Sequence, residues 1–227
     1  MPIPYDRDAS LVSHHPSLLT PPRASGDDDA PTAAAVEAGQ RARILEAMVQ
    51  TVAAQGYPRT TVADVVRAAG VSRSTFYALL AGKEECFLEA YRLGTEVLED
   101  HIDTAMDLAT DGWRGRLQDG IRAYLRVLED DRIFARTFLV EIHQGSPATA
   151  LARDAVLDRF AARFLASHAA AVRAGEGEGT PALEVFAILA HGIDALVARA
   201  LRTGEPEALP ALEPVILDAA LRVLRGA

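Results

Sequence analysis

The segment TTVADVVRAAGVSRSTFYALLAGKEE, residues 60–85, has the boundaries of two short helices joined by a tight turn. Thr61 and Asp64 have the spacing of a capping box, in which a hydroxyl and a carboxylate bond each other's backbone amides where a helix starts. Gly70 can adopt the left-handed conformation that ends a helix, and Ser72 offers a hydroxyl to cap the next one. The segment therefore predicts a helix-turn-helix.

The two expected helices each have an apolar face, and the second also gathers polar residues. Phe76 and Leu80 are four residues apart and should both pack inward. Other positions around the start of this helix are polar: Arg73, Ser74, Thr75 and Tyr77. Such a helix suits DNA, because it fits the major groove, its first residues reach base edges, and its free amides favour phosphate.

These polar side chains suggest separate roles on DNA. Arg73 can read guanine bidentately or contact a phosphate, Thr75 can touch a thymine methyl or a phosphate, and Tyr77 can donate to a phosphate oxygen. Lys83 stands where the next helix should begin, beside free amides, which suits a phosphate clamp. The predicted DNA-binding residues are Thr61, Ser72, Arg73, Ser74, Thr75, Tyr77 and Lys83. The alternative is a helix-turn-helix used only for packing or as an interaction module.

Charge is distributed unevenly along this chain of 227 residues, whose formal net charge is −9. Residues 32–85 carry 6 basic and 5 acidic residues, so the acidity belongs to the segments before and after them. A nearly neutral DNA-binding region gains little from its net charge. We therefore expect DNA affinity to depend on helix-terminus amides and on two such regions acting together, with marked salt sensitivity.

The stretch ILEAMVQTVAAQGYPRTTVADVVRAAGVSRSTFYALLAGKEECF resembles the DNA-binding domain of the TetR family of bacterial transcriptional regulators. The resemblance covers about residues 36–90 and implies a three-helix DNA-binding head followed by a dimerising, ligand-sensing body. The matching positions are Ile44, Ala47, Gly56, Thr61, Val65, Ala69, Gly70, Val71, Ser72, Thr75, Phe76, Tyr77, Lys83 and Glu84. The chain departs at Leu79-Leu80, where the family often has His-Phe: Leu80 keeps the packing role, and a phosphate contact from a histidine at position 79 is lost.

The rest of the sequence predicts helices and no strands. Residues 1–31 hold six prolines and no periodicity, which is typical of a disordered tail. From residue 32 onward, apolar residues recur three and four apart, and we expect an all-α fold with a head at residues 32–85 and a body at residues 86–227. About nine helices are expected, at 33–55, 62–69, 73–80, 84–108, 113–129, 132–144, 147–173, 182–203 and 209–225.

Bulky aromatic residues are concentrated in the central helices of the body. They can form a solid core or enclose a cavity, and the resemblance implies a mainly apolar cavity for a small effector. The candidate lining residues are Trp113, Tyr124, Phe134, Phe138, Phe160 and Phe164, with Glu141, His143 and, more weakly, His168 as polar contacts.

The last two expected helices carry small and apolar residues on one side. This pattern suits either packing within the chain or a two-fold four-helix interface, and the resemblance implies a homodimer. The candidate interface residues are Ala187, Ala190, His191, Asp194, Ala195, Ala198, Leu212, Ile216, Ala220 and Val223. A dimer places its reading helices about 34 Å apart, one turn of the duplex, so the DNA operator is expected to be an inverted repeat.

Other classes of protein have little support in the sequence. There is one cysteine, and the dispersed histidines lack the spacing of a metal site, so we expect no metal, no cofactor and a cytoplasmic location. No nucleophile elbow, P-loop or dinucleotide motif indicates an enzyme, and no stretch is long and apolar enough for a membrane span. The expected function is that of a transcriptional regulator, specifically a repressor released by a small apolar effector.

Overall fold

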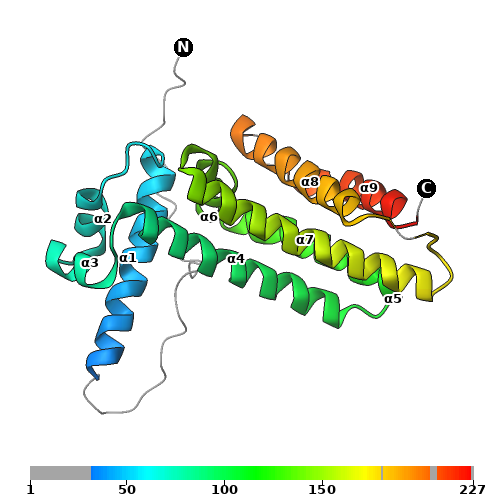
Figure 1. The fold of residues 1–227 in the computed structure, drawn as a ribbon, viewed down its shortest axis with the longest axis horizontal. Helices are drawn as coiled ribbons and strands as arrows, with labels where there is room; N and C mark the ends of the chain where they lie inside the picture. The colour runs from blue at the N-terminus through cyan, green and yellow to red at the C-terminus, as the bar shows by residue number, and fades with distance from the viewer. Residues whose placement is uncertain (1–31, 180, 205–208, 226–227) are drawn as a thin grey trace.

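A computed structural model describes residues 32–179, 181–204 and 209–225 (Figure 1). These residues form nine α-helices and two short 3-10 turns, with no strand among them, so the expected all-α class is confirmed. The disordered tail predicted for residues 1–31 lies outside the described residues. The helices are α1 (Ala33–Gln55), α2 (Val62–Ala69), α3 (Arg73–Leu79), α4 (Lys83–Leu108), α5 (Gly112–Asp130), α6 (Arg132–Leu139), α7 (Pro147–Arg173), α8 (Leu183–Thr203) and α9 (Glu213–Arg225), and the turns are η1 (Glu141–Gln144) and η2 (Pro210–Leu212).

Most predicted helix boundaries agree with the structure, and the largest difference follows α6. The single helix expected over residues 132–144 ends at Leu139, and the chain then tightens into η1. The tighter turn brings Glu141 and Ile142 into buried positions. Apolar periodicity runs through this segment, but the periodicity alone does not distinguish an α-helix from a 3-10 turn.

The head lies at one end of the molecule, and α4 runs from it along the body (Figure 1). In the head, α1 packs against α2 and α4; in the body, α4 packs against α5, and α7 packs against α8. The helices α8 and α9 form the outer layer on one side of the body (Figure 1). The boundary predicted between residues 85 and 86 falls inside α4, so one continuous helix belongs to both parts.

Local caps define the helix-turn-helix as predicted. The Thr61 hydroxyl accepts from the Asp64 amide, and the Asp64 carboxylate accepts from the Thr61 amide at 3.1 Å and from its hydroxyl at 2.6 Å. These hydrogen bonds lower the pKa of Asp64. Gly70 ends α2 in the left-handed conformation with φ 63°, and the Ser72 hydroxyl accepts from the Thr75 amide at 3.0 Å. The bend therefore follows from residues close together in sequence.

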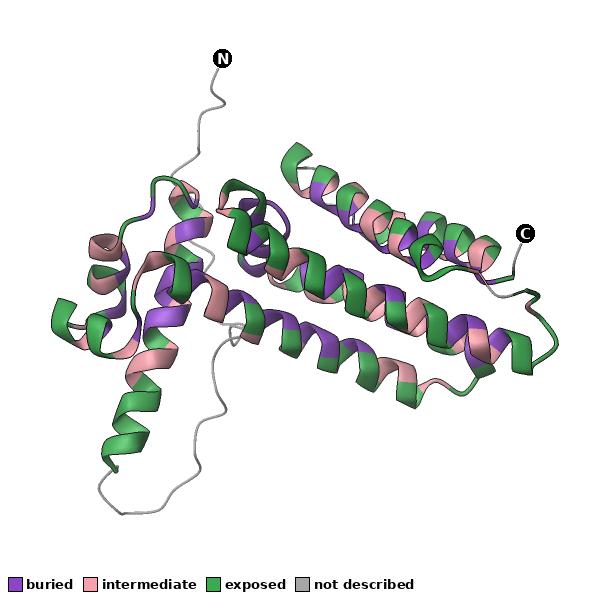
Figure 2. Ribbon diagram, in the orientation of Figure 1, coloured by how far each residue is buried: buried purple, intermediate pink, exposed green. Residues whose placement is uncertain are grey.

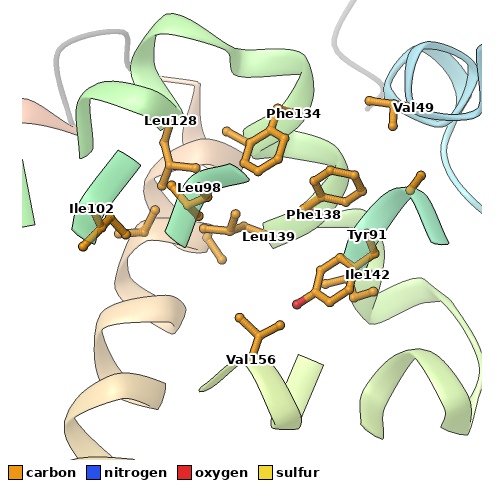
Figure 3. Packing of buried hydrophobic residues seen from close by; sticks show 14 of the residues in the cluster. Val49, Tyr91, Leu98, Ile102, Leu128, Phe134, Phe138, Leu139, Ile142 and Val156 are labelled. Carbon is orange, nitrogen blue, oxygen red and sulfur yellow. The ribbon is translucent and has the colours of Figure 1, made fainter. Parts of the chain in front are cut away.

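Buried side chains form one hydrophobic cluster that runs from the head into the body (Figure 2). Phe87 in the first turns of α4 is fully buried, and its ring lies 4.7 Å from Tyr57 of the head and 6.3 Å from Phe138 of the body. Phe138 also packs edge-on against Phe134 at 4.8 Å (Figure 3). The head is therefore joined to the body by packed aromatic rings, which resist bending at the junction.

Gly94 of α4 lies directly under these rings. A Cβ atom at this position would lie 2.5 Å from a Phe138 ring carbon and 2.7 Å from a Phe134 ring carbon, so the helix approaches α6 too closely for any side chain. Replacing Gly94 with alanine should lower the free energy of unfolding by about 1–3 kcal/mol, the usual cost of overpacking a core. Thermal or urea denaturation measures the change.

The control is Gly39→Ala, because Gly39 is also helical and has open space around an added Cβ. This change should leave stability unchanged or raise it slightly, since alanine favours a helix. Equal effects of the two substitutions would contradict the packing seen at Gly94.

Candidate DNA-binding surface and effector cavity

Polar side chains around the start of α3 form the exposed part of the helix-turn-helix. Phe76 and Leu80 are buried, as predicted, which turns the opposite side of α3 toward solvent. Arg73 and Ser74 are exposed, and Tyr77 keeps 58% of its surface accessible although its ring packs edge-on against Phe76 at 5.3 Å. An exposed guanidinium and an exposed phenol at one helix start are the groups that a DNA-reading helix needs.

The hydroxyls near this start are mostly engaged with one another. Ser72 Oγ caps Thr75, and it also lies 2.7 Å from Ser74 Oγ and 2.8 Å from Thr75 Oγ1. Thr61, another predicted DNA-binding residue, is engaged in the capping box of α2. Ser72 and Thr61 therefore hold the two helices in place, and any contact they make with DNA would be added to that structural role.

Lys83 occupies a different position from the one expected of a free phosphate clamp. Its Nζ donates to the carbonyl of Tyr57 at 3.0 Å and lies 4.1 Å from the centroid of the Tyr57 ring. An ammonium has three N–H donors, so two remain for a phosphate. Lys83 thus ties the start of α4 to the loop between α1 and α2.

Arg41 is a residue at the head–body junction that the sequence analysis missed. Its guanidinium binds Glu89 of α4 with two hydrogen bonds of 2.5 Å and donates to the carbonyl of Leu79 at the end of α3 at 3.0 Å. The hydrogen bond to Glu89 raises the pKa of Arg41. Arg41 is 48 positions from Glu89 in sequence, so local spacing gives no signal of this contact.

Glu141 lies at the head–body junction and not in the predicted effector cavity. Its Oε2 accepts from the Tyr57 amide at 3.0 Å, and only 7% of the residue is accessible. Nearby, the Thr137 hydroxyl donates to the carbonyl of Val49 at 3.3 Å. Because α6 ends at Leu139, Glu141 begins η1, where its carboxylate meets the loop between α1 and α2. His143 follows in the same turn and is exposed, so it also lies outside the cavity wall.

An apolar cavity of about 90 Å³ lies within the body among α4, α5, α6, α7 and α8. Five of the predicted aromatic residues line it: Tyr124, Phe134, Phe138, Phe160 and Phe164. The helix α4 contributes a series of wall residues, and Figure 3 labels three of them: Tyr91, Leu98 and Ile102. His168 is buried elsewhere, where its ring contacts the carbonyls of Leu224 and Gly179.

The cavity wall also contains polar groups that the sequence analysis did not assign to it. Asp194 of α8 is buried and paired with Arg153 of α7, and after burial it is the next cause that raises the pKa of Tyr124. Arg163 of α7 is held by Asp103 at 2.8 Å and by Glu99 at 3.1 Å. Asp194 shares a side of α8 with the small residues of the predicted dimer interface, and that side faces the body.

A second hollow adjoins the cavity and is named here the vestibule. It has a volume of about 880 Å³ and is lined by the end of α4, the start of α5 and the second half of α7. Trp113, predicted for the cavity, lines the vestibule instead. It is the first bulky residue of α5, and the cavity begins one turn further along that helix at Leu117.

The predicted dimer surface divides into buried and accessible residues. Five of its members are buried within the chain: Ala190, Asp194, Ala198, Ile216 and Ala220. Ala187, His191, Leu212 and Val223 are partly buried, and Ala195 is exposed. The small residues allow α8 and α9 to approach α7, so the side chosen from the sequence is largely the inner one. The outer side carries Val185, Ile188 and Val215, which are 39%, 73% and 57% accessible.

No group of three or more histidine, cysteine, aspartate or glutamate side chains could hold a metal ion among the residues placed by the structure. In the same part of the chain, every helix is too short or too polar to cross a membrane.

Comparisons with known proteins agree with this arrangement. Residues 44–90 match the family model described as bacterial regulatory proteins, tetR family. A comparison with curated proteins finds no significant match. Among solved structures, the fatty acid degradation regulator FadR from Bacillus halodurans has a TM-score of 0.72 and 21% identity over 82% of this chain and 96% of its own.

Two further solved structures show the range of the likeness. FadR from Bacillus subtilis, in complex with stearoyl-CoA, has a TM-score of 0.70 and 18% identity over 79% of this chain and 96% of its own. PfmR, a TetR family regulator from Thermus thermophilus, has a TM-score of 0.61 and 24% identity over 82% of this chain and 96% of its own. Identities this low show a shared fold, and the match to the family itself is confined to residues 44–90. The chain is therefore a DNA-binding transcriptional regulator whose DNA-binding segment matches the tetR family model.

Proposed function

We propose that the chain is a cytoplasmic homodimeric repressor that binds an inverted repeat and releases it when a small apolar effector enters the cavity. The observation that carries this proposal is that α4 serves both sites. The helix begins at Lys83, beside α3, and its later turns supply Tyr91, Leu98 and Ile102 to the cavity wall. A ligand that shifts α4 therefore also shifts the head.

The size of the cavity supports a mechanism in which the effector moves the walls. A cavity of about 150 Å³ holds benzene in an engineered protein, and the cavity here is about 90 Å³. A larger apolar molecule fits only if the walls separate, and packed interiors respond by shifting whole helices. An effector with an apolar chain would therefore favour an arrangement of α4 that differs from the one described.

Aromatic contacts provide a continuous physical link from the cavity to the head. Phe138 lines the cavity and packs edge-on against Tyr91 at 5.4 Å. It also neighbours Phe87, which packs against Tyr57. The Tyr57 carbonyl and ring in turn hold the Lys83 ammonium. Displacement of Phe138 by a ligand would thus shift the side chains packed at the start of α4.

The outer side of α8 and α9 supports the proposed dimer. Ile188 and Val215 are exposed apolar residues on neighbouring helices, and Ala195 continues the same side of α8. A two-fold axis can pair such a side with its copy, because the same surface is then buried on both chains. The interface proposed here therefore uses these residues, with Ala187 and His191 at its edge, in place of the buried half of the predicted set.

A role for the helix-turn-helix in packing or protein interaction alone has less support. A helix-turn-helix used only for packing would bury both sides of α3, and here Arg73 and Tyr77 remain exposed.

The effector proposed is a fatty acyl compound, because the similar FadR from Bacillus subtilis was solved with stearoyl-CoA and the cavity here is mainly apolar.

Selection of bound sequences from random duplex DNA tests the central proposal. The selected sites should be inverted repeats with half-sites about one duplex turn apart. Arg73→Ala should weaken binding to the selected site by about 1–3 kcal/mol and relax the preference at one position in each half-site. The charge-matched control is Arg92→Ala on α4, beyond the head, which should leave both unchanged. Unaltered affinity and preference in the Arg73 variant would remove Arg73 from the reading surface.

Lys83→Ala should weaken binding to all sequences and reduce the slope of log affinity against log salt by about one phosphate contact. The salt series separates the two roles of this lysine. A loss of affinity with an unchanged slope would mean that Lys83 only holds Tyr57 and makes no contact with phosphate.

Ile188→Glu should weaken dimerisation roughly a hundredfold or more, because the symmetric interface would bury an unpaired charge from each chain, which costs several kcal/mol. Sedimentation equilibrium measures the change. Leu108→Glu is the matched control, since Leu108 is 76% accessible and lies at the end of α4. A dimer as stable as that of the control would place the interface elsewhere.

A further inference from the structure

The vestibule and the apolar cavity share part of their walls. Met106 of α4 and Arg163 and Ser167 of α7 line both. The vestibule lies at the end of the body far from the head, because it includes the last turns of α4 and the first turn of α5 (Figure 1). A molecule in the vestibule could therefore extend a chain into the cavity without meeting the DNA-binding surface.

Two long side chains lie between the two hollows: Met106, and Arg163, which Asp103 and Glu99 hold. Met106 packs over Gly120, where an added Cβ would lie 2.9 Å from its Cγ, and a methionine thioether adapts readily to a new neighbour. The guanidinium of Arg163 lies 5.6 Å from the ring centroid of Phe160, a cavity residue. A rearrangement of Met106, together with release of Arg163 from Asp103 and Glu99, would join the hollows, with Arg163 at the passage between them.

Arginines outnumber acidic residues in the lining of the vestibule by four to three. Four line it, Arg114, Arg116, Arg163 and Arg173, beside the acids Asp103, Asp111 and Glu176. The ion pairs of Arg114 with Glu176 and of Arg116 with Asp107 are well exposed to water, where such pairs are weak and can exchange partners. Arg173 forms no ion pair with any residue that the structure places. The lining can therefore bind an anion at modest cost.

Trp113 provides an independent sign of a missing partner. It is 8% accessible, and its indole Nε1–H is buried without a hydrogen-bond acceptor in the described part of the chain. The guanidinium of Arg114 lies 5.0 Å from the same ring. A buried donor left unpaired is unfavourable, and Trp113 lines the vestibule, so an anionic oxygen that displaced the atoms covering Nε1 would satisfy it.

We propose that the effector is an amphipathic anion whose head group binds in the vestibule and whose acyl chain passes Met106 and Arg163 into the cavity. This inference rests on the proposed function, because it adds an anionic head group, and a place for it, to the fatty acyl effector proposed for that cavity. The shared chemistry is a carboxylate or phosphate on an apolar chain. The vestibule volume of about 880 Å³ lies within the range of about 300–1,000 Å³ found for small-molecule sites, so it can accept a head group larger than a carboxylate.

Calorimetric titration of the full-length protein without DNA tests the head group. The probes are dodecanoyl-CoA, dodecanoate and dodecanol, which share one chain and differ in charge. At least one anion should bind tenfold or more tightly than dodecanol. Preference for dodecanoyl-CoA identifies a phosphate-bearing head group, and preference for dodecanoate identifies a free carboxylate. Equal affinity for all three compounds, or binding of none, overturns the inference.

Paired double variants test the location. Arg114→Gln with Arg173→Gln should weaken binding of the preferred anion tenfold or more and leave dodecanol unaffected. The control removes two exposed arginines from α4 and α5 outside the vestibule, Arg92→Gln with Arg126→Gln, and should change neither affinity. Equal weakening by the two double variants overturns the assignment to the vestibule.

Fluorescence gives a local readout, because Trp113 is the only tryptophan of the chain. Binding of the anion should change its emission, and an unchanged emission at saturation overturns the placement of the head group. DNA binding by the ligand-free protein is measured separately for every variant. Sequence-specific DNA binding by a protein that binds neither anion refutes this inference alone, and anion binding without sequence-specific DNA binding refutes the proposed repressor alone.

Discussion

The arrangement of head and body depends on α4, which packs against the head at its start and inside the body further along. The first turns of α4 bury Cys86 and Phe87 against the head, and the later turns bury Leu98 and Ile102 in the body. The helix has 26 residues without an interruption, so it spans about 39 Å. A helix of this kind does not absorb a shift locally. Movement of its cavity side must be accommodated at the head, or the packing at one end is lost.

The polar contacts around the head restrict that movement to particular directions. Arg41 joins α1, the end of α3 and α4, and Glu141 holds the Tyr57 amide from the body side. Gly56 allows the carboxylate to approach, since an added Cβ would lie 3.3 Å from Glu141 Oε2 and its φ of 85° favours glycine. Hydrogen bonds of this kind have two discrete states, made or broken, whereas the aromatic core can only slide or repack. The junction thus combines closely packed aromatic rings with a few hydrogen bonds that can break and re-form.

Features that depend on neighbouring residues could be predicted from the sequence, and features that depend on the topology could not. The capping box of Thr61 with Asp64 needs only a three-residue spacing, and it occurs as expected. The partner of Lys83 is Tyr57, which is 26 positions away, so no local pattern indicates it. Ile188 looks like an ordinary core residue in the sequence, and only the fold shows that 73% of its surface is accessible. Apolar periodicity determines that a helix has a packed side; the topology of the whole domain determines which neighbour packs there.

The positions of the charged residues explain how an acidic chain can bind DNA. In the head, Arg41 is paired with Glu89 and Arg67 with Asp64, while Arg73 remains exposed at the start of α3. The six basic and five acidic residues of one head nearly cancel, so its affinity for DNA alone should be low. Two heads held at the correct separation gain affinity because the second contact becomes intramolecular, and that gain is lost when the geometry no longer fits. Weak individual contacts thus make DNA binding sensitive to a small tilt of α4.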